Sequence, residues 1–172
     1  VGAAVSRVPV INGGNGNKEH ALGAGCMLFN IRHYLGFVEG ASVGFYGPAE
    51  FSRCAKGLLP ILGYYGAKVF VDDVQGHFPF PKDVEEAARR NGLGSITYGP
   101  LEKFITQLDW LVVCNAVPTA SITDAQRAAV KEHYRAINSS DMNSLRKNAW
   151  LDGIPPCVCE IERDVLSDPR TV

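Results

Sequence analysis

The sequence has no apolar run near the roughly 20 residues that a helix needs to cross a bilayer. Its first residues, VGAAVSRVPVING, lack both the basic start and the long apolar segment of a signal peptide. Neither sign of charge is in excess, because 17 Lys and Arg residues face 18 Asp and Glu residues. We therefore expect a cytoplasmic protein that binds neither membranes nor nucleic acid through bulk electrostatics.

Cysteine is scarce, and its five copies form no recognisable disulfide or metal framework. An odd number of cysteines scattered through apolar segments indicates a reducing compartment. Cys157 and Cys159 are the only close pair, and in an extended segment their side chains would point to opposite faces. No second Cys or His pair lies at zinc-finger spacing, so the sequence predicts no metal site.

The length and composition fit one domain with a substantial core. The chain has 172 residues, of which 46% are apolar, as is typical of a globular protein of this size. No internal repeat or low-complexity linker divides it, so we predict a single domain over residues 1–172. The first residue is not Met, and we expect the chain to be a segment of a longer protein.

Short apolar runs alternate with helical patterns along most of the chain. Strands are predicted at 8–11, 41–46, 68–72, 95–98, 110–114, 134–137 and 149–151. Helices are predicted at 19–37, from 51 to a stop at Gly66, and at 82–91, 101–107, 123–133 and 139–146. The strand at 110–114 is the most apolar and should be central. This alternation predicts an α/β fold, a three-layer αβα sandwich with a mainly parallel, Rossmann-like sheet.

Ligands bind such sheets at the carboxyl ends of the strands. One strand ends at Gly47, and Asp72 and Asp73 follow at about the spacing of a dinucleotide site, where an acid reaches a ribose. The G-x-G-x-x-G run is missing, however, and Glu50 would repel a pyrophosphate at the following helix. A nucleotide-binding domain of the Rossmann type therefore stays as an alternative, beside an ordinary βαβ unit with solvated aspartates.

Two basic side chains are the strongest candidates for a site. His20 should lie in the first turn of a helix, where the helix dipole favours a neutral ring that donates a hydrogen bond to a carbonyl oxygen. Arg53 should also lie in a first turn, where a cation opposes the dipole, and its guanidinium fork suits a carboxylate or phosphate. The alternatives are a surface histidine and a salt bridge between Arg53 and Glu50.

Four segments in register resemble one known family. They are VPVINGGNGNKEH, ASVGFYGPAEFSRCAKGLL, LDWLVVC and IPPCVCEI, the last followed by Asp164-Val165 and Asp168-Pro-Arg170. Together they resemble the second, amino-acid-binding half of the aspartate/ornithine carbamoyltransferases, which transfer a carbamoyl group from carbamoyl phosphate to an amine. The resemblance covers nearly the whole chain.

The resemblance implies a set of roles and no cofactor. His20 would donate to the carbamoyl carbonyl oxygen, and Arg53 would hold a carboxylate of the amino-acid substrate. Asn115 stands in the loop after the strand at 110–114, and Pro155 and Pro156 stand at the substrate turn. The implied partners are an amino acid or related amine and a carbamoyl-phosphate domain in the same or another chain, and a homo-oligomer is compatible with the sequence.

The departures from the family pattern are substantial. Gly23 stands where aspartate-specific members carry a Gln, and Asn115 and Val117 stand where they carry an Arg and a Gln. The Ser-Thr-Arg-Thr-Arg pattern of the carbamoyl-phosphate domain is absent. Two hypotheses follow beside the nucleotide-binding one. The chain is either an amino-acid-binding domain, most simply for an aspartate-like amine, that needs the missing domain, or an inactive pseudoenzyme kept as an assembly module.

Overall fold

A computed structural model describes residues 8–10, 13–16, 18–114 and 122–138. The described strands form one parallel sheet in the order β3-β2-β1-β4. The strands are β1 (Ser42–Tyr46), β2 (Lys68–Asp72), β3 (Ser95–Tyr98) and β4 (Trp110–Val113). The helices are α2 (Ala21–Leu35), α3 (Arg53–Tyr64), α4 (Lys82–Arg90) and α5 (Asp124–Asn138), with 3-10 turns η1 (Leu101–Lys103) and η2 (Ile105–Gln107). The predicted α/β fold with a parallel sheet is confirmed.

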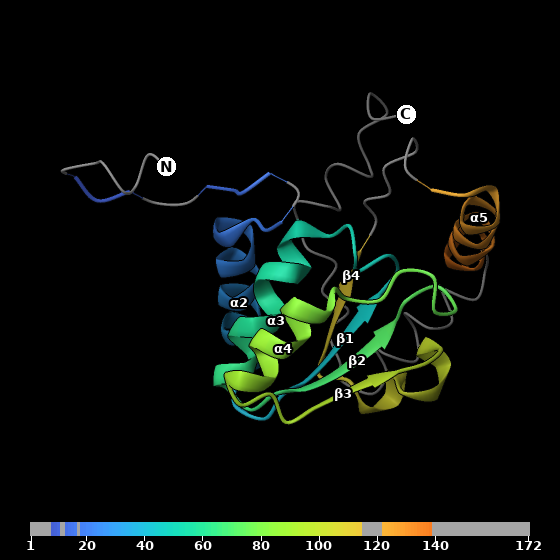
Figure 1. The fold of residues 1–172 in the computed structure, drawn as a ribbon. Helices are drawn as coiled ribbons and strands as arrows, with labels where there is room; N and C mark the ends of the chain where they lie inside the picture. Colours follow the sequence, from blue (N-terminus) through green and yellow to red (C-terminus); the bar gives the residue numbers. More distant parts are fainter. Residues whose placement is uncertain (1–7, 11–12, 17, 115–121, 139–172) are drawn as a thin grey trace.

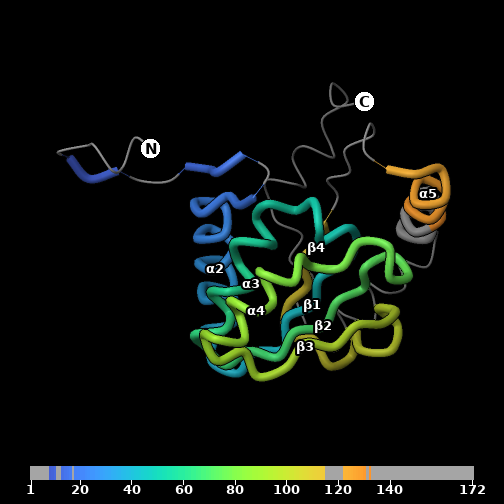
Figure 2. Tube along the Cα trace, in the orientation of Figure 1, coloured from blue at the N-terminus to red at the C-terminus, as the bar shows by residue number. Residues whose placement is uncertain are grey.

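Alternate residues of each strand enter different cores, as the two-residue period of a strand requires. On one face of the sheet, Val43, Phe45, Val69 and Val71 pack with apolar residues of α2, α3 and α4. Those helices lie side by side across this face in Figures 1 and 2. On the other face, strand residues pack with the η1 and η2 turns. Both faces are therefore covered, which is why the strands read as continuous apolar runs.

α5 packs through Val130 against the segment that follows β2. Val130, Val74 and Phe78 form a third small core, with Phe51 and Ile122 at its margin. Val74 has φ of 60°, a left-handed conformation that is rare for a β-branched residue. This segment therefore leaves β2 through an unusual turn before α4 begins.

Several predicted elements need correction. Residues 134–137 continue α5 and form no strand, because the helix that starts after Thr123 runs through Asn138. Val8, Pro9 and Val10 form no strand. The strand at 110–114 lies at one end of the described sheet and not at its centre, since β4 pairs only with β1 among the described strands. The elements predicted at 139–146 and 149–151 lie outside the described residues.

The predicted helix at 101–107 is two short 3-10 turns. The helix expected from residue 51 begins at Arg53, capped by Ser52, and continues past Pro60 to Tyr64. The helix expected at 19–37 spans Ala21–Leu35. No helix in the part of the chain that the structure describes is long and apolar enough to span a membrane.

Candidate functional site

His20 caps α2 instead of lying within its first turn. Its ring Nδ1 accepts a hydrogen bond from the Gly23 amide at 2.8 Å. That bond satisfies one of the free N–H groups at the helix start. It also fixes the neutral tautomer, because a ring nitrogen that accepts carries no proton. Nε2 is therefore the nitrogen of His20 that can donate, as the predicted contact with a carbonyl oxygen requires.

Arg53 is the first residue of α3, and Ser52 is the N-cap. The Ser52 hydroxyl accepts from the Ala55 amide at 3.3 Å, so the cap does not depend on Arg53. The Arg53 guanidinium donates through Nη1 to the Gly16 carbonyl at 3.2 Å, across 37 residues of sequence. Within the described residues no ion pair joins Arg53 to Glu50. The fork therefore keeps most of its donors for another acceptor.

The two candidate residues lie side by side. The His20 amide donates to the Arg53 carbonyl at 3.2 Å, which joins the N-termini of α2 and α3. The loop that contains Gly16 contacts both residues, since Arg53 donates to Gly16 and a Cβ atom on Gly14 would lie 3.9 Å from the His20 ring. Because α3 follows β1, this cluster lies at the carboxyl end of the sheet.

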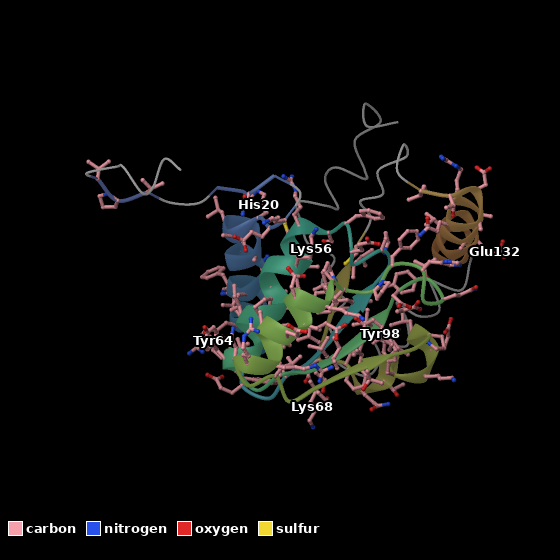
Figure 3. All side chains as sticks on the ribbon, viewed as in Figure 1. His20, Lys56, Tyr64, Lys68, Tyr98 and Glu132 are labelled. Carbon is pink, nitrogen blue, oxygen red and sulfur yellow. The ribbon has the colours of Figure 1, made fainter. Side chains whose placement is uncertain are left out.

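The electrostatics of the cluster favour an anionic group. Two helix N-termini meet there, and each carries a partial positive charge. Lys56 lies one turn into α3, on the same helix as Arg53, and is labelled in Figure 3. Burial lowers the pKa of Lys56, the charges of Glu50 and Asp83 oppose this, and the Arg53 charge adds to it. A carboxylate beside Arg53 would offset these positive charges.

Sequence reasoning missed Ser52 and Lys56, although Ser52 is a common capping residue type.

The remaining predicted site residues, Asn115, Pro155 and Pro156, lie outside the described residues. Cys114 marks where the chain leaves β4 towards Asn115. Its amide donates to the Tyr46 carbonyl at 2.7 Å, and its carbonyl lies against Gly47. The chain thus leaves β4 beside the β1 end that leads to Arg53. No group of three or more metal-ligating side chains occurs among the described residues.

A separate pocket of about 510 Å³ lies at the ends of β1, β2 and β3. Its lining includes Tyr46, Tyr98 and the carboxylates of Asp72, Asp73, Glu102 and Glu132. Both oxygens of Asp72 accept backbone amides, from Val74 at 3.3 Å and from Leu101 at 2.9 Å. Asp73 accepts the Gly76 amide at 2.8 Å. These aspartates hold turns, and four carboxylates repel a pyrophosphate, which weighs against the nucleotide-binding alternative.

The two tyrosines of this pocket give a prediction about alkaline pH. Burial raises the pKa of Tyr46 above its ordinary value of 10.0, with the charges of Asp72 and Glu102 adding to the effect. Burial and a hydrogen bond to Glu85 likewise raise the pKa of Tyr98. The folded state therefore favours the neutral phenols. Their contribution to the free energy of unfolding is fully present below pH 10, and it is lost as pH rises through the folded pKa values.

We expect Tyr46→Phe to leave the tyrosinate absorbance of the folded protein between pH 10 and 11 unchanged. In urea the same substitution should remove one tyrosine's share of that absorbance. Ultraviolet titration in both solvents checks this. A loss of absorbance in the folded protein would show that Tyr46 ionises normally there.

The fold is that of the aspartate and ornithine carbamoyltransferases. Aspartate transcarbamoylase from Trypanosoma cruzi in complex with carbamoyl phosphate superposes with a TM-score of 0.67 at 22% identity, over 79% of this chain and 44% of that one. Ornithine carbamoyltransferase from Pyrococcus furiosus gives a TM-score of 0.61 at 21% identity, over 74% of this chain and 42% of that one. At these identities the likeness establishes the fold.

No protein-family model matches the chain. The chain is 30% identical to multifunctional protein ura1 of Schizosaccharomyces pombe over 170 residues, 99% of this chain and 8% of that protein. It is 28% identical to the aspartate carbamoyltransferase catalytic subunit of Alkaliphilus oremlandii over 166 residues, 96% of this chain and 50% of that subunit. The chain is thus similar in sequence to aspartate carbamoyltransferase catalytic subunits and spans about half the length of those it matches.

Proposed function

We propose that the chain is the amino-acid-binding half of a carbamoyltransferase-like protein, with His20 and Arg53 in its site. The observation that supports this proposal is the hydrogen bond from the His20 amide to the Arg53 carbonyl, which joins the backbones of the two residues. We also propose that residues 1–172 form a single domain. This domain would act in the cytoplasm with a carbamoyl-phosphate domain in the same or another chain.

The chemistry assigned to the two side chains follows from their donors. In carbamoyl transfer the amine forms a bond to the carbamoyl carbon, the bond from that carbon to phosphate breaks, and the amine loses a proton. Negative charge develops on the carbonyl oxygen, where a donor such as the Nε2–H of His20 stabilises the transition state. Arg53 would hold a carboxylate of the amino acid and orient its amine.

An aspartate-like substrate is the class that the relatives favour. A Trypanosoma cruzi relative was crystallised with carbamoyl aspartate and phosphate. In this chain the positive ends of α2 and α3, together with Arg53, suit the carboxylates of such a molecule. Gly23, Asn115 and Val117, which replace polar residues of the family pattern, favour the alternative of an inactive assembly module.

Calorimetry on the whole chain separates these functions. Carbamoyl phosphate and L-aspartate are titrated together and singly, followed by a panel of other amino acids, NAD and ATP. We expect heat from an acidic amino acid and a loss of affinity of about 10- to 150-fold in Arg53→Ala, since a hydrogen bond to a charged group contributes about 1.5–3 kcal/mol. Arg53→Lys should recover part of it, because Lys keeps the charge without the fork.

Arg32→Ala is the matched control, because Arg32 is an exposed arginine of α2 that pairs only loosely with Glu39 at 3.9 Å. Its affinity should equal that of the unaltered chain. Binding that survives Arg53→Ala would remove Arg53 from the site. No heat from any ligand would favour the assembly module, and heat from NAD or ATP alone would favour the nucleotide-binding domain.

A further inference from the structure

Position 23, in the first turn of α2, has no room for a side chain. A Cβ atom on Gly23 would lie 2.6 Å from the Cys54 sulfur and 3.0 Å from the His20 Nδ1 atom. Real Cβ atoms essentially never approach another heavy atom to less than 3.0 Å. Gly23 does not lie in the left-handed region, so its neighbours, and not its backbone conformation, require a glycine here.

The close crossing of α2 and α3 is the cause of this crowding. A Cβ atom on Gly57 would lie 3.0 Å from the Ala24 Cβ and 3.6 Å from the His20 carbonyl oxygen. Small residues on both helices therefore bring the two backbones together, and the hydrogen bond from His20 to Arg53 closes the same contact. Cys54, next to Arg53, is thereby held against the start of α2.

We infer that Gly23 and Cys54 are a coupled pair of positioning residues that set the orientation of His20. The Gly23 amide holds Nδ1 and so leaves the proton on Nε2. The Cys54 thiol fills the space where a side chain at position 23 would begin, so a larger residue there must displace either the thiol or the imidazole. This inference deepens the proposed function. Its consequence for catalysis or binding rests on that proposed function.

The pair also gives a reason for the departure at position 23. Where the family pattern has a glutamine, this chain has a glycine whose side-chain space is taken by the sulfur of another helix. A glutamine at position 23 would have to displace the Cys54 sulfur or the His20 ring. The side of the site next to His20 is therefore shaped by Cys54, and the substrate specificity of this chain should depend on that residue.

Nitrogen-15 NMR of the histidine rings in the whole chain tests the coupling, with His20 assigned through His20→Gln. In the unaltered protein we expect His20 as the Nε2–H tautomer and a Gly23 amide proton shifted downfield by its bond to Nδ1. Gly23→Ala should displace the ring, mix the two tautomers and lose that amide shift. Gly23→Ala with Cys54→Ala should restore the Nε2–H tautomer and the downfield amide shift, because the added methyl group takes the place of the sulfur.

Gly25→Ala is the matched control, since Gly25 lies on the same helix and a Cβ atom there meets nothing within 4 Å. It should leave the His20 signals unchanged. Unchanged His20 signals in Gly23→Ala, or no recovery in the double variant, would overturn the inference even if thermal stability fell.

Amino-acid affinity measured on the same variants separates the two proposals. It should fall at least tenfold in Gly23→Ala and recover in the double variant. A further outcome is that the NMR signals respond as expected while neither the unaltered chain nor any variant binds an amino acid. In that case the pair still positions His20, and the proposed function fails. Full affinity in Gly23→Ala despite a displaced ring would overturn the role of the pair in the site.

Discussion

Gly47→Ala should lower the free energy of unfolding by roughly 2–6 kcal/mol, because two separate costs of about 1–3 kcal/mol each meet at this residue. Gly47 has φ of 102°, outside the conformations that residues with a side chain readily adopt. A Cβ atom there would also lie 2.2 Å from the Cys114 carbonyl oxygen. That carbonyl cannot move away easily, since the Cys114 amide is bonded to Tyr46. Urea denaturation of both proteins measures the loss.

Gly76→Ala separates the two costs. Gly76 also has a positive φ, 84°, but a Cβ atom there meets nothing within 4 Å. It should therefore show the backbone cost alone, about 1–3 kcal/mol. If Gly47→Ala proves no more destabilising than Gly76→Ala, the contact with Cys114 is not a constraint.

The sheet was the part of the fold that the sequence predicted best. β2 spans the predicted residues 68–72, and β1 begins at Ser42, one residue later than predicted. The reason is physical: β1, β2 and β4 are largely buried, so each consists mostly of apolar residues, with polar or Gly residues close by. The strand order could not be predicted, because every strand pairs with others far away in sequence.

The helix starts were less predictable. Ser52 is a standard cap, yet the apolar Phe51 before it suggested an earlier start for α3. His20 is not a usual cap, and its role depends on a ring nitrogen that meets the Gly23 amide. In α5 the four residues 134–137 resembled a strand by alternation alone. So short an alternation does not outweigh a helix already initiated by the hydrogen bonds between Thr123 and Gln126.

The neighbourhood of the site could not be derived from periodicity. Sequence patterns gave reasons to suspect His20 and Arg53 one at a time, and the family resemblance placed both in one site. What brings their backbones together is the crossing of α2 and α3 at Ala24 and Gly57. Small residues at a helix crossing leave no hydrophobic pattern that distinguishes them from other small residues. For the same reason, the contact between Gly23 and Cys54 could not be predicted from the sequence pattern.

The second large effect is expected at Asp72, a residue that is 8% exposed. Asp72→Ala should cost roughly 2–6 kcal/mol, because it leaves two amides without an acceptor, at about 1–3 kcal/mol each. One of them belongs to Leu101, so the carboxylate ties the end of β2 to the start of η1 across 29 residues. Asp72→Asn keeps one carbonyl oxygen and should cost about half as much. Urea denaturation gives the stabilities, and hydrogen exchange at the Leu101 amide locates the loss.

The same variants distinguish this structural role from the one that a dinucleotide site would give Asp72. A carboxylate that binds a ribose is spare in the absence of ligand, so its replacement by Asn would change stability little and would abolish NAD binding. A carboxylate that accepts two buried amides behaves in the opposite way. If Asp72→Asn unfolds as the unaltered chain does, the hydrogen bonds to Val74 and Leu101 contribute little. The end of β2 would then be open to a ligand, and the nucleotide-binding alternative would regain its strongest residue.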